Sequence, residues 1–146
     1  MTVLGDVFIL KALKQRNLGS CKVQIRVYYE DVDAGGICYH SKYLNFCERA
    51  RSELFFSKNT TPIQGEYHFV VKNIHADYIS PALFGDTVTV TTSMIESKKA
   101  SITMLQEIFN QKDQLLFTMQ IVLVCMKGTR VSKIPESYKE ILNPEP

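Results

Sequence analysis

The chain contains one stretch with helical periodicity, and four stretches that favour β-strands follow it. Between residues 41 and 57, apolar side chains recur at steps of three and four residues, which gives a helix one apolar face. Segments 67–79, 85–97, 100–110 and 114–127 are rich in strand-forming residues and are separated by turn-forming sequences. A helix with a single apolar face must bury it on another element. The pattern therefore predicts an α+β domain, with an antiparallel sheet packed on one long helix.

A further strand is predicted ahead of the helix. In segment 21–30, Val23, Ile25, Val27 and Tyr29 alternate with other side chains, so they are expected to share one face of the strand. Ser41 is the expected N-cap of the helix, because its hydroxyl can accept a backbone N–H bond there. Residues 115–126, LLFTMQIVLVCM, are apolar on both faces, as expected for a central strand.

Length and charge limit the classes of protein that the chain can belong to. With 146 residues it is expected to form a single domain over residues 21–135, with an N-terminal extension (1–20) and a C-terminal tail (136–146). The net charge of +2 is small and the basic residues are scattered, so no nucleic-acid partner is expected.

The apolar runs and the cysteines indicate a compartment. No run approaches the roughly 18 apolar residues of a membrane span, and the run VFIL (7–10) is too short for a signal peptide. Integral membrane contact is therefore not expected. Cys21, Cys38, Cys47 and Cys125 lack the spacing of a zinc site or a disulfide framework, which favours reduced thiols and a cytoplasmic location.

Several chemically useful groups gather just before the predicted helix. Asp31 and Asp33 precede the adjacent glycines Gly35 and Gly36, and His40 follows at the expected helix start. Each group has a structural interpretation by itself, since aspartate and glycine form turns and a histidine at a helix end can be solvated. An acid, a glycine pair, a histidine and a helix start within ten residues together indicate a functional site.

Two alternative interpretations of this segment are weak. The pattern DVDAGG resembles the start of a calcium-binding loop, but Gly35 stands at the fifth position and Lys42 at the twelfth, where such loops carry acidic ligands. A Cys38 nucleophile with His40 as its base is the second alternative, and the local spacing of the two residues gives it little support. Neither a metal nor a cofactor is required.

The extended segment RVYYEDVDAGGICYHSKYLNFCERAR (26–51) resembles the motif of the bacterial hotdog-fold acyl-CoA thioesterases, in the 4-hydroxybenzoyl-CoA thioesterase-like family. It is most similar to the branch named for its association with the Tol–Pal genes. The resemblance covers about residues 22–130 and includes ADYISPALFGDTVTV (76–90). It implies a hotdog fold, in which the sheet wraps around the helix, and assembly into homodimers or homotetramers.

The resemblance also implies roles for particular residues. Asp33 matches the catalytic carboxylate, and His40 matches a histidine at the start of the central helix, where the backbone N–H polarises the thioester carbonyl in related members. Gly35 and Gly36, with the adjoining Tyr39, are expected to contact the substrate. The chemistry fits independently, because hydrolysis builds negative charge on the carbonyl oxygen and a helix N-terminus offers N–H donors. The carboxylate can activate water or attack the carbonyl directly, and both routes stay open.

Contacts to the CoA phosphates are expected at a basic turn. Lys98, Lys99 and Ser101 occupy the turn that supplies basic groups in similar proteins, although a solvated hairpin turn explains them equally well. The sequence thus predicts hydrolysis of acyl-CoA to free acid and CoA. The rivals are another hotdog enzyme, such as an acyl-thioester dehydratase, and a non-catalytic acyl-thioester-binding or scaffold protein. The position of Asp33 at the start of the motif favours the hydrolase.

Overall fold

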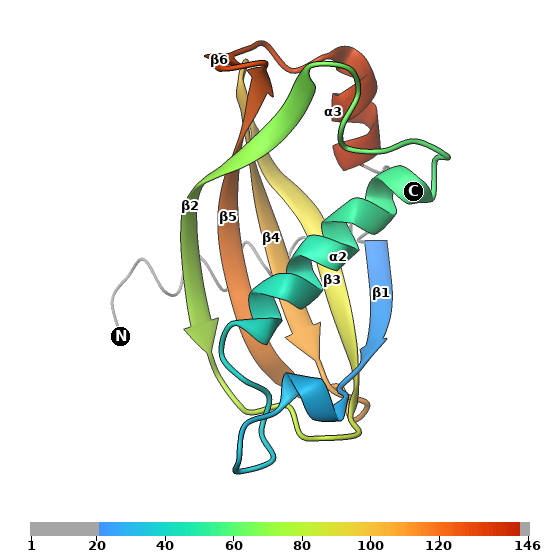
Figure 1. Ribbon diagram of the computed structural model, residues 1–146, viewed down its shortest axis with the longest axis vertical. Coiled ribbons are helices and arrows are strands. Elements are labelled where there is room, and N and C mark those ends of the chain that lie inside the picture. The colour runs from blue at the N-terminus through green and yellow to red at the C-terminus, as the bar shows by residue number, and fades with distance from the viewer. Residues whose placement is uncertain (1–20, 144–146) are drawn as a thin grey trace.

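The computed structural model describes residues 21–143, which form one antiparallel sheet with a long helix lying across its face (Figure 1). The predicted N-terminal extension, residues 1–20, lies outside the described residues, as do residues 144–146. Along the chain the elements are β1 (Cys21–Arg26), the 3-10 helix η1 (Tyr29–Asp31), α2 (Lys42–Phe56), β2 (Tyr67–Tyr78), β3 (Thr87–Ser97), β4 (Ser101–Phe109), β5 (Leu115–Lys127), β6 (Arg130–Val131) and α3 (Glu136–Leu142).

The order of strands in the sheet is β1-β3-β4-β5-β2, and the short β6 pairs with β5. The prediction that 115–126 form an internal strand is confirmed, because β5 lies between β4 and β2. β1 and β2 occupy opposite edges of this path, so the chain crosses the sheet face between them, and α2 makes that crossing (Figure 1). A register shift between Val71 and Asn73 marks a bulge in β2.

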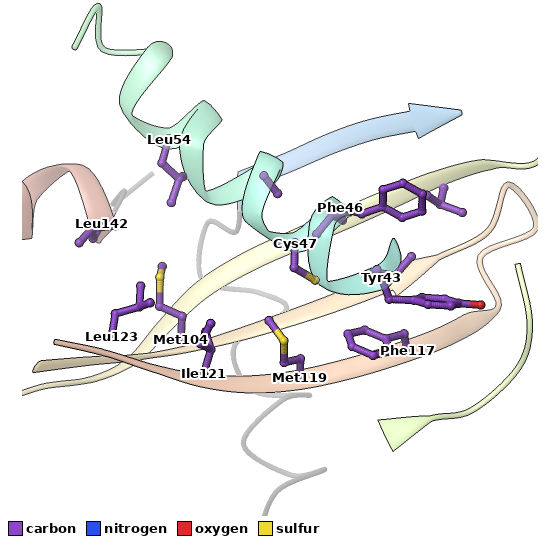
Figure 2. Packing of buried hydrophobic residues seen from close by; sticks show 14 of the residues in the cluster. Tyr43, Phe46, Cys47, Leu54, Met104, Phe117, Met119, Ile121, Leu123 and Leu142 are labelled. Carbon is purple, nitrogen blue, oxygen red and sulfur yellow. The ribbon is translucent and has the colours of Figure 1, made fainter. Parts of the chain in front are cut away.

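The core forms where the apolar face of α2 meets the sheet (Figure 2). The predicted helical stripe is confirmed, since its members are all buried. Side chains of β4 and β5 face this stripe, and Tyr43 stacks on Phe117 at a ring distance of 5.2 Å. Burying each large apolar side chain stabilises the fold by about 1.5–3 kcal/mol. The buried members of the stripe are Tyr43, Phe46, Cys47, Ala50 and Leu54.

The first strand ends earlier than its alternating pattern predicts. β1 stops at Arg26, and Tyr29 is 82% exposed in η1, so its predicted place on the same strand face as Val23, Ile25 and Val27 is wrong. The cause is the carboxylate of Asp31, which accepts the Tyr28 N–H at 2.9 Å, while the Asp31 N–H donates to the Tyr28 carbonyl at 3.0 Å. These bonds close a turn where a ladder bond would otherwise continue the strand.

The C-terminal segment differs from the tail expected over 136–146. Residues 136–142 form α3, in which Tyr138 and Leu142 are buried in the core cluster. The Tyr138 ring packs against Phe55 of α2 at 5.7 Å and against Phe69 of β2 at 5.5 Å. A seven-residue helix has little stability of its own, so this packing holds it in place.

Among residues 21–143, no helix combines the length and the apolar character needed to cross a bilayer.

Candidate active site

The loop that carries Asp33 is a tight backbone turn. The Asp33 N–H donates to the Ile37 carbonyl at 2.9 Å, and the Gly36 N–H donates to the Asp33 carbonyl at 3.0 Å. Val32 and Cys38 form an antiparallel bridge at its base. Gly36 has a φ of +77°, a left-handed conformation that favours glycine. The turn thus fixes the backbone of Asp33 at the start of the turn, next to the bridge at its base.

Gly35 does not share the left-handed φ of Gly36 and has a different role in the turn. Its N–H donates to Oδ1 of Asp33 at 2.8 Å, and a Cβ at Gly35 would lie only 3.2 Å from that oxygen. The missing side chain therefore lets the carboxylate fold back onto its own turn. The side chain of Asp33 remains exposed, so solvent or a substrate can reach it.

Asp31 lies two residues away in a contrasting environment. It is only 2% exposed, and its Oδ2 accepts the Tyr28 N–H. Its Oδ1 lies 3.6 Å from Nζ of Lys42 in the first turn of α2, and its carbonyl accepts the Tyr39 N–H at 2.8 Å. These contacts tie η1 to the start of the helix. They are those of a structural acid.

The helix entrance is built differently from the expected cap. The backbone of Ser41 is already helical, with φ −75° and ψ −20°, and its hydroxyl makes no capping bond, so the prediction of a side-chain cap is wrong. The carbonyl of Tyr39 accepts the Lys42 N–H at 2.9 Å, and that of His40 accepts the hydroxyl of Tyr78 at 2.6 Å. Within residues 21–143, the N–H groups of His40 and Ser41 have no acceptor. They are available as donors at the positive end of the helix dipole.

A cavity of about 310 Å³ brings the acid and the helix entrance together. Of the predicted site residues, Asp33, Tyr39 and His40 line it, and the rings of Tyr39 and His40 lie 4.3 Å apart. Two larger hollows, of about 390 and 490 Å³, lie along α2, but none of the predicted site residues lines either of them. The remaining walls of the 310 Å³ cavity are Ile37, Cys38, Tyr43, Tyr78, Ile79, Ser80 and Pro81.

The thiol in this cavity is not a ready nucleophile. Burial, with a smaller contribution from the charge of Asp31, raises the pKa of Cys38 to about 11. The thiol therefore stays protonated near neutral pH, whereas a nucleophilic cysteine needs a lowered pKa.

Within the described part of the chain, no group of three or more His, Cys, Asp or Glu residues is placed to hold a metal ion.

The basic turn lies at the other end of the sheet from this cavity. Lys98 and Lys99 connect β3 to β4, where the Lys98 N–H donates to the Ser101 carbonyl at 2.8 Å. Nζ of Lys98 is 3.9 Å from a carboxylate oxygen of Glu96. β3 has 11 residues, and at about 3.3 Å per residue it spans more than about 30 Å. The structure therefore does not bring these three residues to Asp33 within one chain.

Tyr78 is the contact that sequence reasoning missed. It ends β2 and reaches the helix entrance through its hydroxyl, although 38 positions separate it from His40. The sequence offered one weak signal, which is that Tyr78 stands in ADYISP, part of a segment included in the family resemblance. An aromatic residue at the end of a predicted strand is ordinarily assigned to packing.

An antiparallel sheet wrapped on one long helix is the arrangement of the hotdog fold. Residues 27–142 match the family model described as "Thioesterase-like superfamily", and the chain belongs to this family.

Relatives and solved structures agree with the family. The chain is 37% identical over 131 residues to the acyl-CoA thioesterase YbgC of Helicobacter pylori, covering 83% of this chain and 98% of the relative. A 1,4-dihydroxy-2-naphthoyl-CoA thioesterase from Synechocystis superposes with a TM-score of 0.78 at 21% identity, covering 85% and 96% of the two chains. A probable thioesterase from Bartonella henselae gives 0.74 at 26% identity, covering 80% and 100%. The predicted hotdog fold is confirmed.

Proposed function

We propose that this chain hydrolyses acyl-CoA thioesters to the free acid and CoA. The observation that carries the proposal is that one cavity is lined by the carboxylate of Asp33 and by the helix entrance at His40, whose N–H has no acceptor in the described residues. The similar Helicobacter pylori protein is named an acyl-CoA thioesterase, which supports the choice of substrate class.

The His40 N–H is the donor to the thioester carbonyl oxygen in this proposal. Attack on the carbonyl carbon moves an electron pair onto that oxygen, and a preorganised N–H stabilises the negative charge where it develops. The dipole of the 15-residue helix α2 acts in the same direction. Because the donor is backbone, the proposal needs no particular protonation state of the His40 ring.

Asp33 supplies the base or the nucleophile. As a base it takes a proton from water while the water oxygen bonds to the carbonyl carbon, the C–S bond then breaks, and the CoA thiolate leaves and is protonated. As a nucleophile it forms an acyl anhydride with release of the thiolate, and water then hydrolyses the anhydride. The products of the two routes are the same acid and thiol.

Replacement of Asp33 by asparagine tests the proposal. The amide oxygen can still accept the Gly35 N–H, so the turn should be retained, but neither base nor nucleophile remains. We expect kcat/KM for the best acyl-CoA, chosen from a panel from acetyl to palmitoyl, to fall by about 10²–10⁴-fold or more. Thermal melting controls for folding.

The Asp33→Asn result separates the proposal from its rivals. A well-folded variant that keeps wild-type turnover would remove Asp33 from catalysis. A wild-type protein that binds acyl-CoA without releasing thiol would indicate the non-catalytic binding protein, and one that dehydrates a hydroxyacyl thioester would indicate the dehydratase.

We also propose that the functional unit is a homo-oligomer joined through β2. This edge strand has 12 residues and exposes the apolar side chains of Val70, Val71, Ile74 and Tyr78. Edge strands favour pairing with another strand. Antiparallel pairing of two β2 strands about a two-fold axis would place the Asp33 end of one sheet beside the opposite end of the other, where Lys98, Lys99 and Ser101 lie. The proposed contacts to CoA phosphates are then made between subunits.

Two further expectations stay predictions. The four cysteines are free thiols, three of them buried, which supports a reducing compartment such as the cytoplasm. Redox-sensitive labelling of the protein in cells would contradict this if it found the thiols oxidised. The similarity to the branch associated with the Tol–Pal genes would be tested by the gene's chromosomal neighbours.

A further inference from the structure

We infer that Tyr78 is a positioning residue for the helix entrance, because its hydroxyl fixes the peptide that carries the Ser41 N–H, and this peptide adjoins the one that carries the proposed donor N–H of His40. The inference rests on the proposed function in one respect, namely that these N–H groups act on the substrate. The geometry itself is independent of that function.

The ring of Tyr78 is held firmly although the residue is 52% exposed. It meets Tyr43 edge to face at 5.3 Å and Phe117 at 5.1 Å, and both of those residues are buried. The hydroxyl donates to the His40 carbonyl at 2.6 Å, at the short end of the range for O–H···O bonds. A fixed ring thus presents a strong donor to one particular backbone carbonyl.

Both peptide planes that meet at His40 are anchored by their carbonyls. The Tyr39 carbonyl is held by the Lys42 N–H, and the His40 carbonyl is held by Tyr78. A trans peptide is planar, with its N–H pointing opposite to its C=O. Anchoring the two carbonyls therefore also sets the directions of the His40 and Ser41 N–H groups, which have no acceptor in the described part of the chain.

The Tyr78 hydroxyl takes a carbonyl that a helix would normally use. In an α-helix the His40 carbonyl would accept the Leu44 N–H, four residues on. Within residues 21–143 that bond is not formed, and the next one, from the Asn45 N–H to the Ser41 carbonyl, is 3.4 Å long. Removing the hydroxyl would free the His40 carbonyl to turn toward Leu44, and the peptide that carries the Ser41 N–H would turn with it.

The Tyr78 hydroxyl also keeps its proton near neutral pH. Burial, followed by smaller contributions from Cys38 and Cys47, raises the pKa of Tyr78 above its usual value. It therefore remains a donor to the carbonyl and does not become a competing anion beside Asp33.

The test compares Tyr78→Phe with Tyr67→Phe. Both changes remove one hydroxyl from β2, but Tyr67 lies at the other end of the strand, where its ring packs near Tyr138 and Lys127 and outside the cavity. For Tyr78→Phe we expect kcat to fall about 10–100-fold with KM within about twofold, because a misplaced donor weakens transition-state binding. For Tyr67→Phe we expect kcat to be unchanged, because its ring does not line the cavity of its own chain.

A second readout needs no activity. The backbone amide ¹⁵N and ¹H resonances of His40 and Ser41 should shift in Tyr78→Phe, while those of Asp33 and Gly35 stay in place. In Tyr67→Phe all four should remain where they are in the wild type.

Two outcomes would overturn the inference: an unchanged kcat in Tyr78→Phe, whether or not KM rises, or unmoved His40 and Ser41 resonances. Failure of the proposed function is recognised separately. If Asp33→Asn keeps full turnover, the hydrolytic mechanism is wrong, while the amide resonances still decide whether Tyr78 holds the helix entrance.

Discussion

Asp31 and Asp33 are the same residue type two positions apart, yet their surroundings give them different tasks. Asp31 is buried, and its carboxylate oxygens contact a backbone N–H and the ammonium of Lys42. Asp33 is exposed at the edge of a cavity. The motif assigns the proposed chemistry to Asp33, and that role stays a prediction. The anchoring of Asp31 by Lys42 depends on how η1 meets α2, which no local pattern encodes.

At the residue scale, the buried thiols should make stability fall in alkaline solution. Burial raises the pKa of Cys38 to about 11 and that of Cys47 to about 12, whereas a thiol in the unfolded chain ionises near about 8.5. Above that pH the unfolded chain releases protons that the folded chain retains, so the free energy of unfolding decreases as pH rises.

We therefore expect the melting temperature to decline from about pH 9 toward pH 11, and a Cys38→Ala, Cys47→Ala double variant to decline less over the same range. Thermal melts at closely spaced pH values measure both curves. Parallel curves for the two proteins would show that other groups cause the decline.

The helix α2 is joined to the sheet by one fully buried polar side chain, as well as by its apolar face. Nε2 of Gln106 donates to the Cys47 carbonyl at 2.8 Å and to Oγ1 of Thr92 at 3.0 Å. Its Oε1 accepts Nη1 of Arg51 at 2.8 Å, and burial lowers the pKa of that guanidinium. Every strong donor and acceptor of the amide is thus used, and α2, β3 and β4 are linked at one point.

At the element scale, Gln106→Leu should destabilise the fold by about 2–4 kcal/mol, because it leaves the half-buried guanidinium of Arg51 without its partner and removes the bonds to Cys47 and Thr92. Adding Arg51→Met should recover much of this loss, since an apolar pair of similar size leaves no buried charge. Chemical denaturation of the two single variants and the double variant measures the coupling. Purely additive effects would mean that the two side chains do not act as a pair.

The elements themselves were largely predictable, and the exceptions have physical causes. The stripe of α2 and the apolar run of β5 are strong local patterns, and both were recovered. The helix α3 was missed because it depends on Tyr138 packing between Phe55 and Phe69, which are remote in sequence. Tyr78 was missed for the same reason, because its partner His40 belongs to another element.

At the scale of the whole molecule, one chain leaves its site open. Asp33 is exposed, and the basic turn is more than about 30 Å from it along the sheet. A second copy paired through β2 is expected to cover the open side of the cavity at Asp33 and to bring its own basic turn there. Light scattering should therefore give at least a dimer at micromolar concentration, and a monomer alone would contradict the arrangement.

Mixing two variants tests whether the lysines act between subunits. Asp33→Asn alone should be inactive, and the double variant Lys98→Ala, Lys99→Ala should keep its kcat with a KM raised roughly tenfold. If the lysines bind the CoA at the partner's Asp33, co-refolded hybrids contain some sites that have both an intact Asp33 and intact lysines. The mixture should then show a component with wild-type KM. A rate equal to the sum of the two parents would mean that the lysines do not act in this way.

The strand order has a consequence for the path of folding. The inner pairings join near neighbours, such as Ser93 with Leu105, whereas the edge pairings join distant ones, such as Val23 with Val90. Closing a longer loop costs more conformational entropy, so we expect the β3–β4–β5 meander to form before the edges.

The loop that carries Asp33 is bonded to the segments that follow the two edge strands. The Cys38 N–H donates to the carbonyl of Ala82, after β2, and the Tyr39 N–H donates to the carbonyl of Asp31, in η1 after β1. Pulse-labelled amide exchange during refolding should protect β4 before these two amides, and the opposite order would refute this sequence of events. In this order the loop that carries Asp33 is the last part to form, so partly folded chains would lack the candidate site.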